Sequence, residues 1–236
     1  MAKLSVFAHL VVRGGGSTFY RKNLYPLYGL PVVGHAIALC QAAGMVDEVF
    51  VWSEDAEVQQ VARSLGAHAL ARPREMVHYF SGFHSLDEWG ASRFGQVVEL
   101  RGTPGDIHLS LNCNNFLVRP ETLRAMFQRL EDDPQAMRIT AMRRVASGLC
   151  LKNPNTGYMF PFWNDPHTPP GQAPGLFRLV GASFSSRPRQ MAGINGSLHH
   201  EVDEEEGFDF QTEEDVALAE FYLERRKARQ GAEVRP

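Results

Sequence analysis

Basic residues surround a run of glycines near the start of the chain. Arg13 precedes glycines 14 to 16, and the sequence Arg-Lys-Asn follows at 21 to 23. Because the loop directly follows the apolar run 4 to 12, its backbone N–H groups can bind an anion at the edge of a sheet. Three cations suit a triphosphate better than a dinucleotide, because a triphosphate carries more charge to neutralise. The weaker alternative is a surface loop with a solvated basic pair.

The glycine spacing excludes two common phosphate motifs. Gly14, Gly15 and Gly16 are contiguous, whereas the dinucleotide fingerprint requires G-x-G-x-x-G and the P-loop ends in G-K-S or G-K-T. A dehydrogenase is therefore disfavoured.

These residues resemble a known family. The segment VVRGGGSTFYRKNLYPLYGLPVVGHAIALCQAAGMVDEVFVWSED is similar to the opening of the acylneuraminate cytidylyltransferases, the group of CMP-sialic acid and CMP-Kdo synthetases. The likeness returns at DIHLSLNCNNFLVRPETL and GFDFQTEEDVALAE. It implies one α/β domain, a homodimer, and Mg²⁺-dependent transfer of CMP from CTP to a small acidic acceptor, with release of pyrophosphate.

The resemblance also implies site residues by position. It places Arg13, Lys22 and Asp209 at the catalytic centre, with Asp209 as a Mg²⁺ ligand. This agrees with the chemistry, because a metal-bridged triphosphate needs hard oxygen ligands and cations on its oxygens. The residues expected to bind nucleotide are Val12, Arg13, Gly14, Gly15, Gly16, Ser17, Lys22, Asn23 and Asn112. Those expected to bind the acceptor are Asn112, Asn114, Asn115, Arg143 and Tyr79.

The chain departs from the family pattern within this site. Where the family has G-S-K, this chain has Gly16 and Ser17 without the Lys. Where the family has the second Asp of D-x-D, this chain has Gln211, a poorer Mg²⁺ ligand. The family's Q-P-T-S-P-L-R reads NCNNFLV. A changed acceptor, such as an acidic keto-sugar or a phosphonate-like anion, is the leading explanation. The alternative is a catalytically weakened nucleotide-binding homologue that acts as a partner or regulator. Candidates for the missing positive charge are Arg143, Arg144 and Lys152.

Periodicity predicts the elements that position these residues. In the first half, strands are expected at 4–12, 49–52 and 67–73, with helices at 31–43 and 55–65. Pro31 suits a helix start, and Gly44 and Gly66 suit helix ends. The alternation of strand and helix predicts a parallel sheet with right-handed crossovers. In the second half, strands are expected at 106–112, 137–145 and 177–184, with helices at 119–133 and 212–230.

We therefore predict a three-layer α/β/α Rossmann-like nucleotidyltransferase fold with a mostly parallel sheet. One domain is expected over residues 1–229, and residues 230–236 are expected to form a disordered tail. Prolines crowd the stretch from 153 to 175, which excludes long regular elements there. Residues 146–180 are accordingly predicted to protrude as a Pro-rich dimerisation arm containing a hairpin.

Composition limits the remaining classes. The 236 residues are 44% hydrophobic and carry a formal charge of -3, which suits one soluble domain. Apolar runs fall short of the roughly 18 residues a membrane span needs. We expect a cytoplasmic protein that binds neither membrane nor nucleic acid. The three cysteines, an odd number, are expected to be buried thiols. The His199-His200 pair and the acidic run 203–206 are interpreted as solvated, although the latter could attract Mg²⁺.

Overall fold

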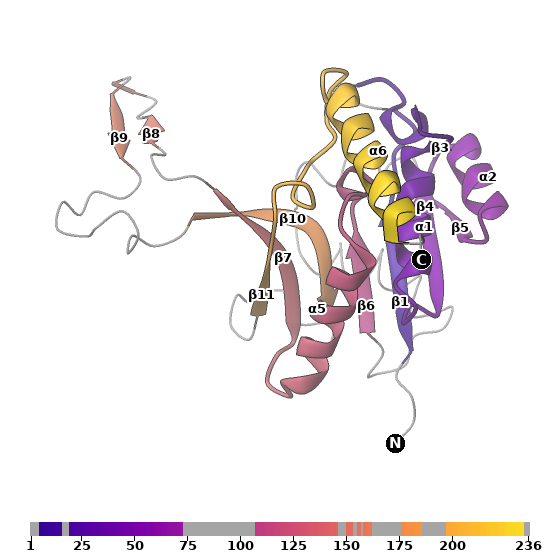
Figure 1. Ribbon diagram of the computed structural model, residues 1–236, viewed down its shortest axis with the longest axis horizontal. Coiled ribbons are helices and arrows are strands. Elements are labelled where there is room, and N and C mark those ends of the chain that lie inside the picture. Colours follow the sequence, from indigo (N-terminus) through magenta and orange to yellow (C-terminus); the bar gives the residue numbers. More distant parts are fainter. Residues whose placement is uncertain are drawn as a thin grey trace.

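The computed structural model describes residues 5–15, 19–72, 107–145, 150–152, 155–156, 158–161, 176–185 and 197–233. Its centre is a seven-stranded sheet in the order β11-β7-β10-β6-β1-β4-β5 (Figure 1). The strands are β1 (Val6–Val11), β4 (Glu48–Ser53), β5 (His68–Ala71), β6 (Ile107–Leu111), β7 (Arg138–Val145), β10 (Leu176–Ser185) and β11 (Ser197–Val202). β10 runs antiparallel to β6 and β7, and the other four neighbouring pairs are parallel. The predicted mostly parallel sheet is confirmed.

Helices and short elements surround this sheet. The helices are α1 (Val32–Ala42), α2 (Ala56–Ser64), α5 (Pro120–Asp132) and α6 (Asp215–Glu233). Two 3-10 turns, η1 (Lys22–Leu24) and η4 (Cys113–Asn115), follow β1 and β6. Two small antiparallel sheets pair β2 (Pro26–Leu27) with β3 (Leu30–Pro31), and β8 (Cys150–Lys152) with β9 (Met159–Pro161).

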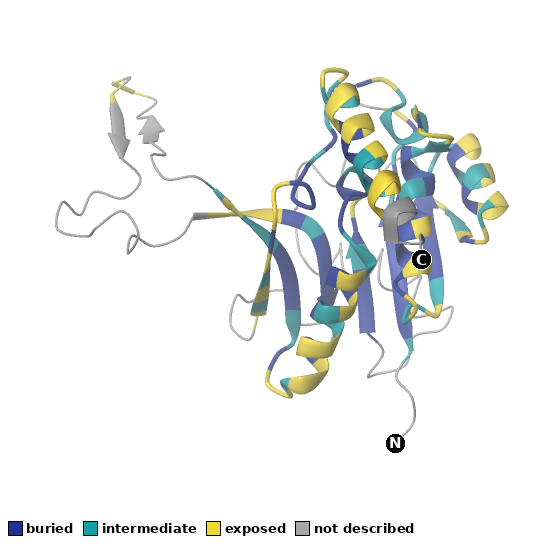
Figure 2. Cartoon of the chain, viewed as in Figure 1, coloured by how far each residue is buried: buried dark blue, intermediate teal, exposed yellow. Residues whose placement is uncertain are grey.

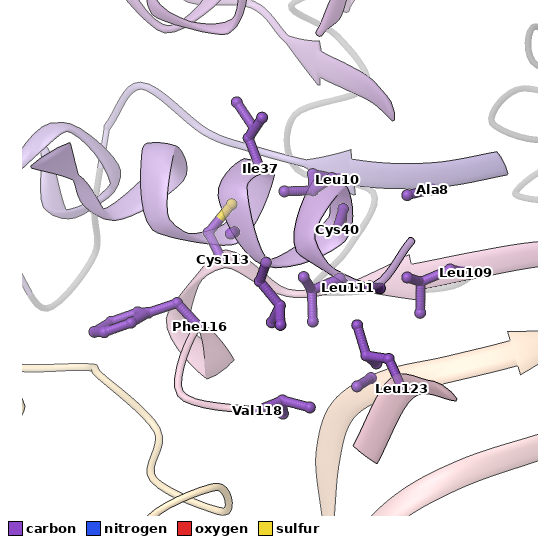
Figure 3. Packing of buried hydrophobic residues seen from close by; sticks show 14 of the residues in the cluster. Ala8, Leu10, Ile37, Cys40, Leu109, Leu111, Cys113, Phe116, Val118 and Leu123 are labelled. Carbon is purple, nitrogen blue, oxygen red and sulfur yellow. The ribbon is translucent and has the colours of Figure 1, made fainter. Parts of the chain in front are cut away.

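The core lies against both faces of the sheet. Because side chains alternate along a strand, Ala8 and Leu10 of β1 face α1 while Phe7 and His9 face the other way. All four are buried, which makes β1 a dark strand at the centre of the molecule (Figure 2). On the helical face, Ile37 and Cys40 of α1, Leu111 of β6 and Leu123 of α5 converge in one cluster (Figure 3). Burial on both faces explains why β1 reads as a continuous apolar run.

Helix ends follow the sequence signals. Pro31 is the N-cap of α1, and Gly44 and Gly66 take φ values of +78° and +79° after α1 and α2. These left-handed conformations favour glycine. The Asp55 carboxylate caps α2 by accepting the N–H groups of Glu57 and Val58 at 2.9 and 3.1 Å. These signals placed the first two crossovers correctly from sequence.

The structure adds detail that the sequence did not predict. β11, which contains His199 and His200, pairs in parallel with β7 at the edge of the sheet. The terminal helix α6 continues to Glu233, so the first residues of the predicted disordered tail are helical. Burial of Cys40 and Cys113 is confirmed; it raises the pKa of both thiols, that of Cys113 to about 12.

The predicted arm contains the expected hairpin. The β8–β9 pair stands apart from the main sheet, beyond the first residues of β10 (Figure 1). Nothing in the structure tests the domain boundaries, which stay predictions. Among the described helices, none combines the length and apolarity needed to cross a membrane.

Candidate functional site

The predicted site residues gather at one edge of the sheet. β1 ends at Val11 and leads into Arg13 and Gly14, and β6 ends at Leu111 and leads into Asn112 and η4. These are carboxyl ends of neighbouring parallel strands, where open α/β sheets bind their ligands. Gly16, Ser17 and Tyr79 lie outside the described residues.

The first part of the glycine loop is held by two carboxylates after β4. The N–H of Gly14 donates to Glu54 Oε1 at 2.9 Å, so this N–H is already occupied. A Cβ built on Gly14 would lie 2.2 Å from Asp55 Oδ2. Because this distance is too short for any side chain, the position requires glycine. The predicted role of Gly14 in binding nucleotide stays a prediction, and an anion would have to displace Glu54 from this N–H. No atom lies within 4 Å of a Cβ built on Gly15, which leaves open space there.

Two more loop residues differ from expectation. The side chain of Val12 belongs to the core, and its N–H donates to Trp52 O at 3.0 Å, so only its backbone carbonyl can face a ligand. Arg21 donates to Asp55 at 3.4 Å and to Glu57 at 2.8 Å, so its charge is compensated by α2. Of the three cations that suggested a triphosphate, Arg13 and Lys22 are left to meet an anion.

Asn23 and Lys22 connect the loop to the rest of the site. Asn23 Nδ2 donates to Arg13 O at 2.9 Å and so fixes the backbone of the loop. Lys22 Nζ donates to Gln211 Oε1 at 2.7 Å. Burial lowers the pKa of Lys22, an effect that the charge of Asp209 partly opposes. A half-buried ammonium whose direct partner is a neutral amide favours the arrival of an anion.

Asp209 lies at the centre of the site. Its neighbours Phe208 and Phe210 are buried, which places the carboxylate on the opposite side, as predicted. Gln211 Nε2 and Asn114 Nδ2 both donate to Asp209 Oδ1, the former at 2.8 Å. Oδ2 forms an ion pair with Arg178 of β10. A chain of contacts therefore runs from Lys22 through Gln211 and Asp209 to Arg178.

Sequence reasoning missed Arg178. It lies in β10, a strand whose return to the sheet was predicted, but no local pattern connects it to a residue in the loop before α6. Its side chain is 48% exposed, whereas that of Asp209 is 16% exposed. Arg178 therefore presents its charge to solvent directly beside the predicted metal ligand.

The asparagines after β6 have different roles. Asn112 is exposed, while Asn115 is buried and uses its amide inside the fold. Asn115 Nδ2 donates to Phe208 O and its Oδ1 accepts the N–H of Gly181, both at 3.0 Å. These contacts give Asn115 a structural role, and its predicted contact with the acceptor stays a prediction. Asn112 and Asn114 remain candidates.

Arg143 and the acidic run also have structural partners. Arg143 Nη1 lies 3.3 Å from Glu204 Oε1. The Arg143 side chain packs over Gly207, because a Cβ built on Gly207 would lie 2.5 Å from Arg143 Cδ. Glu205 and Glu206 are buried, so the interpretation of the run as solvated is wrong for these two, whereas Asp203 and Glu204 are exposed as expected. Their contacts hold the turn that leads to Asp209.

The residues around Asp209 limit how a metal could bind. Mg²⁺ commonly takes one or two protein carboxylates together with substrate phosphates. Within the described part of the chain, no group of three or more His, Cys, Asp or Glu side chains is arranged to hold a metal. Asp209 supplies one such carboxylate, with the amide N–H groups of Asn114 and Gln211 on Oδ1, and its role as a metal ligand stays a prediction.

Comparison with known proteins identifies the family of the chain. A family model described as Cytidylyltransferase matches residues 10–156. The 3-deoxy-manno-octulosonate cytidylyltransferase of Escherichia coli is 24% identical over 144 residues, which are 61% of this chain and 53% of that protein. The chain thus aligns with about half the length of this curated relative.

Solved structures share the fold over most of the chain. A CMP:2-keto-3-deoxy-manno-octonic acid synthetase complexed with CTP superposes with a TM-score of 0.67 at 18% identity, covering 94% of this chain and 99% of that one. A 4-diphosphocytidyl-2C-methyl-D-erythritol synthase gives 0.67 at 13% identity, covering 94% and 100%. Another from Anaerococcus prevotii gives 0.63 at 9%, covering 94% and 99%.

Proposed function

The chain belongs to the cytidylyltransferase family, and on that premise we propose that it transfers CMP from CTP to a small acidic acceptor and releases pyrophosphate. The observation that carries the proposal is the connection of Lys22 to Asp209 through Gln211, at the carboxyl edge of the sheet. The family match and the similarity to a synthetase complexed with CTP support the choice of nucleotide.

The cations act on the phosphates. In the proposed reaction an acceptor oxygen attacks the α-phosphorus of CTP, and the bond to the β-phosphate oxygen breaks with loss of pyrophosphate. Such reactions depend on positioning and on compensation of negative charge. In this proposal Lys22 and Arg13 neutralise phosphate oxygens, and Asn23 supports the loop through its hydrogen bond to Arg13 O. Asp209 would hold Mg²⁺ bound to the triphosphate, which supplies charge compensation during departure of pyrophosphate.

The acceptor is proposed to bind beside Arg178 and Asn112. An exposed guanidinium recognises a carboxylate or phosphonate in bidentate fashion. Asn112 is exposed at the end of β6, and its N–H donates to Gly181 O at 2.7 Å. This bond holds Asn112 beside β10, the strand that contains Arg178. An acidic keto-sugar and a phosphonate-like anion both meet this requirement.

We also propose a homodimer in which the segment 146–180 contacts the partner. Leu179 and Phe177, at the start of β10, are large apolar side chains with 66% and 39% exposure. Such a patch next to a protruding hairpin suits a protein interface. Size-exclusion chromatography with light scattering tests this; Leu179→Asp should yield monomers.

A second candidate function is a nucleotide-binding homologue without turnover. Gln211 favours it, because its amide oxygen accepts from Lys22 where the family has a carboxylate. Such a protein would bind CTP and fail to release pyrophosphate with any acceptor.

The deciding experiment combines binding and turnover. Calorimetry with CTP, ATP, GTP and UTP should give preference for CTP, and a panel of acidic sugars and phosphonates should include one that releases pyrophosphate. Equal affinity for CTP and ATP would contradict the proposal. CTP preference without release from any acceptor would favour the second candidate.

A further inference from the structure

The two oxygens of Asp209 have different partners. Oδ1 accepts two amide N–H groups, from Asn114 and Gln211. Oδ2 faces the Arg178 guanidinium. A carboxylate oxygen offers about two lone-pair directions, so Oδ1 is filled by its amides. A metal can therefore reach this carboxylate only through Oδ2, where Arg178 lies.

The amides are fixed by the fold. The backbone carbonyl of Asn114 accepts the N–H of Phe210 at 3.0 Å, which ties η4 to the strand-like segment around Asp209. The N–H of Gln211 donates to Asp215 Oδ2 at 2.7 Å, and its side chain is held by Lys22. These partners keep both amides directed at Oδ1.

Arg178 differs because its side chain is half exposed and comes from the outer part of β10. An exposed ion pair has little net stability, since solvent screens it. Arg178 can therefore leave Asp209 at low cost, whereas the amide of Gln211 would also have to give up its hydrogen bond to Lys22. Arg178 and a divalent cation would also repel each other at one oxygen.

We propose that Arg178 is a displaceable counter-ion that occupies Asp209 in the nucleotide-free protein and yields it only to a metal that arrives bound to the triphosphate. The proposal rests on the proposed function, of which it is a refinement. It makes two events dependent on each other: metal–nucleotide binding frees the guanidinium, and only then can Arg178 contact the acceptor's anionic group.

The test is direct titration of the nucleotide-free chain with Mn²⁺, followed by the electron paramagnetic resonance signal of the free ion. Mn²⁺ prefers the same hard oxygen ligands as Mg²⁺. Removing the guanidinium removes its repulsion of a divalent cation at the same oxygen, and solvent screening of the half-exposed Arg178 keeps this effect modest. Arg178→Gln should therefore bind Mn²⁺ about fivefold more tightly than the wild type.

Two further variants make the result specific. Arg143→Gln removes the arginine that pairs in register with Arg178 on β7 but contacts Glu204, and it should leave Mn²⁺ affinity unchanged. The double variant Arg178→Gln/Asp209→Asn should lose the gain. Unchanged affinity in Arg178→Gln, or a gain that persists without Asp209, would overturn the proposal.

Failure here is distinguishable from failure of the proposed function. The Mn²⁺ titration contains no nucleotide, so it decides the role of Arg178 even if CTP does not bind. Conversely, CTP preference together with unchanged Mn²⁺ affinity in Arg178→Gln would leave the proposed function standing and remove the counter-ion. Thermal unfolding of each variant checks that the fold is retained.

Discussion

Two acidic groups lie close together in the sequence, and both contact arginines, yet their environments differ. In the turn 203–206, Glu205 is buried and accepts from Arg225 and Arg226 of α6. Asp209 is less buried, has two neutral amide donors, and meets one exposed arginine. The first carboxylate is fully used by the fold, whereas the second has one oxygen whose partner can be exchanged. The difference suits a structural role for Glu205 and the proposed role of Asp209 at the site.

Glu206 extends the structural group. It accepts the N–H of Arg119 at 2.8 Å and the hydroxyl of Thr122 at 2.5 Å, so it joins the turn to the start of α5. The turn is therefore connected to α5 and α6 at once, and the chain leaves it through Gly207 toward Asp209. The buried carboxylates of the turn therefore fix the backbone that leads to Asp209, the proposed metal ligand.

The largest effect on stability is expected in the turn. Glu205→Ala leaves two arginines without their shared carboxylate and should lower the free energy of unfolding by about 3 kcal/mol, since broken buried pairs cost about 3 to 5 and these arginines are partly exposed. Glu204→Ala is the matched control, because that side chain is 83% exposed and should change stability by less than about 0.5 kcal/mol. Urea unfolding measures both. Equal losses would show that the turn does not contain a buried anchor.

The next effect concerns the phosphates. Lys22→Ala should weaken CTP binding by about 1.5 to 3 kcal/mol while leaving cytidine nearly unchanged, because a charge-assisted contact to phosphate is lost. Arg21→Gln removes the adjacent charge, which already contacts Asp55 and Glu57, and should have a much smaller effect. Calorimetry compares the variants. Similar losses for CTP and cytidine would show that Lys22 only supports the loop.

Acid should weaken the structural carboxylates. Burial alone would raise the pKa of Glu205, but hydrogen bonds from Arg225 and Arg226 outweigh it and hold the pKa below its ordinary value of 4.5. Burial would likewise raise the pKa of Asp215. Hydrogen bonds from the N–H groups of Gln211 and Thr212 outweigh this effect, so the pKa of Asp215 lies below its ordinary value of 3.8. Groups with a lowered folded pKa stabilise the protein above their unfolded pKa, and this contribution disappears as pH falls through the folded value.

Stability should therefore be constant from neutral pH down to about 5 and fall below about 4.5. Asp215→Asn should reduce this acid sensitivity and cost about 1 kcal/mol at pH 7 through its lost charge-assisted bonds. Urea midpoints between pH 3 and pH 7 test this. Stability that rises on acidification would contradict the assigned directions.

The sequence predicted most of the strands and helices well, because local signals determine them. The strand before the glycines, the helix after Pro31 and the N-cap of α2 depend on neighbours within a few residues. β11 was missed because an edge strand with alternating exposed polar residues resembles a solvated segment. The terminal helix, expected from residue 212, begins at Asp215, whose carboxylate accepts the Thr212 N–H at 2.8 Å.

The site was predicted less completely because its partners are distant in sequence. Family position brought together Lys22, Asp209 and Asn114, and the structure gives them a shared hydrogen-bonded network. Nothing in the residue types distinguishes the buried Asn115 from the exposed Asn112, since only the tertiary fold decides where an amide lies. Arg178 reaches Asp209 from another strand, and strand periodicity carries no information on such a contact.

We propose that Asp209 serves the reaction, whereas Glu205 and Glu206 serve the fold. The most direct measurement is Mg²⁺-dependent pyrophosphate release from CTP by Asp209→Asn, recorded together with its melting temperature. We expect Asp209→Asn to lose turnover and to keep a melting temperature close to that of the wild type, because an amide is a much poorer metal ligand than a carboxylate. Normal pyrophosphate release by this variant, or a large fall in its melting temperature with turnover retained, would contradict the account.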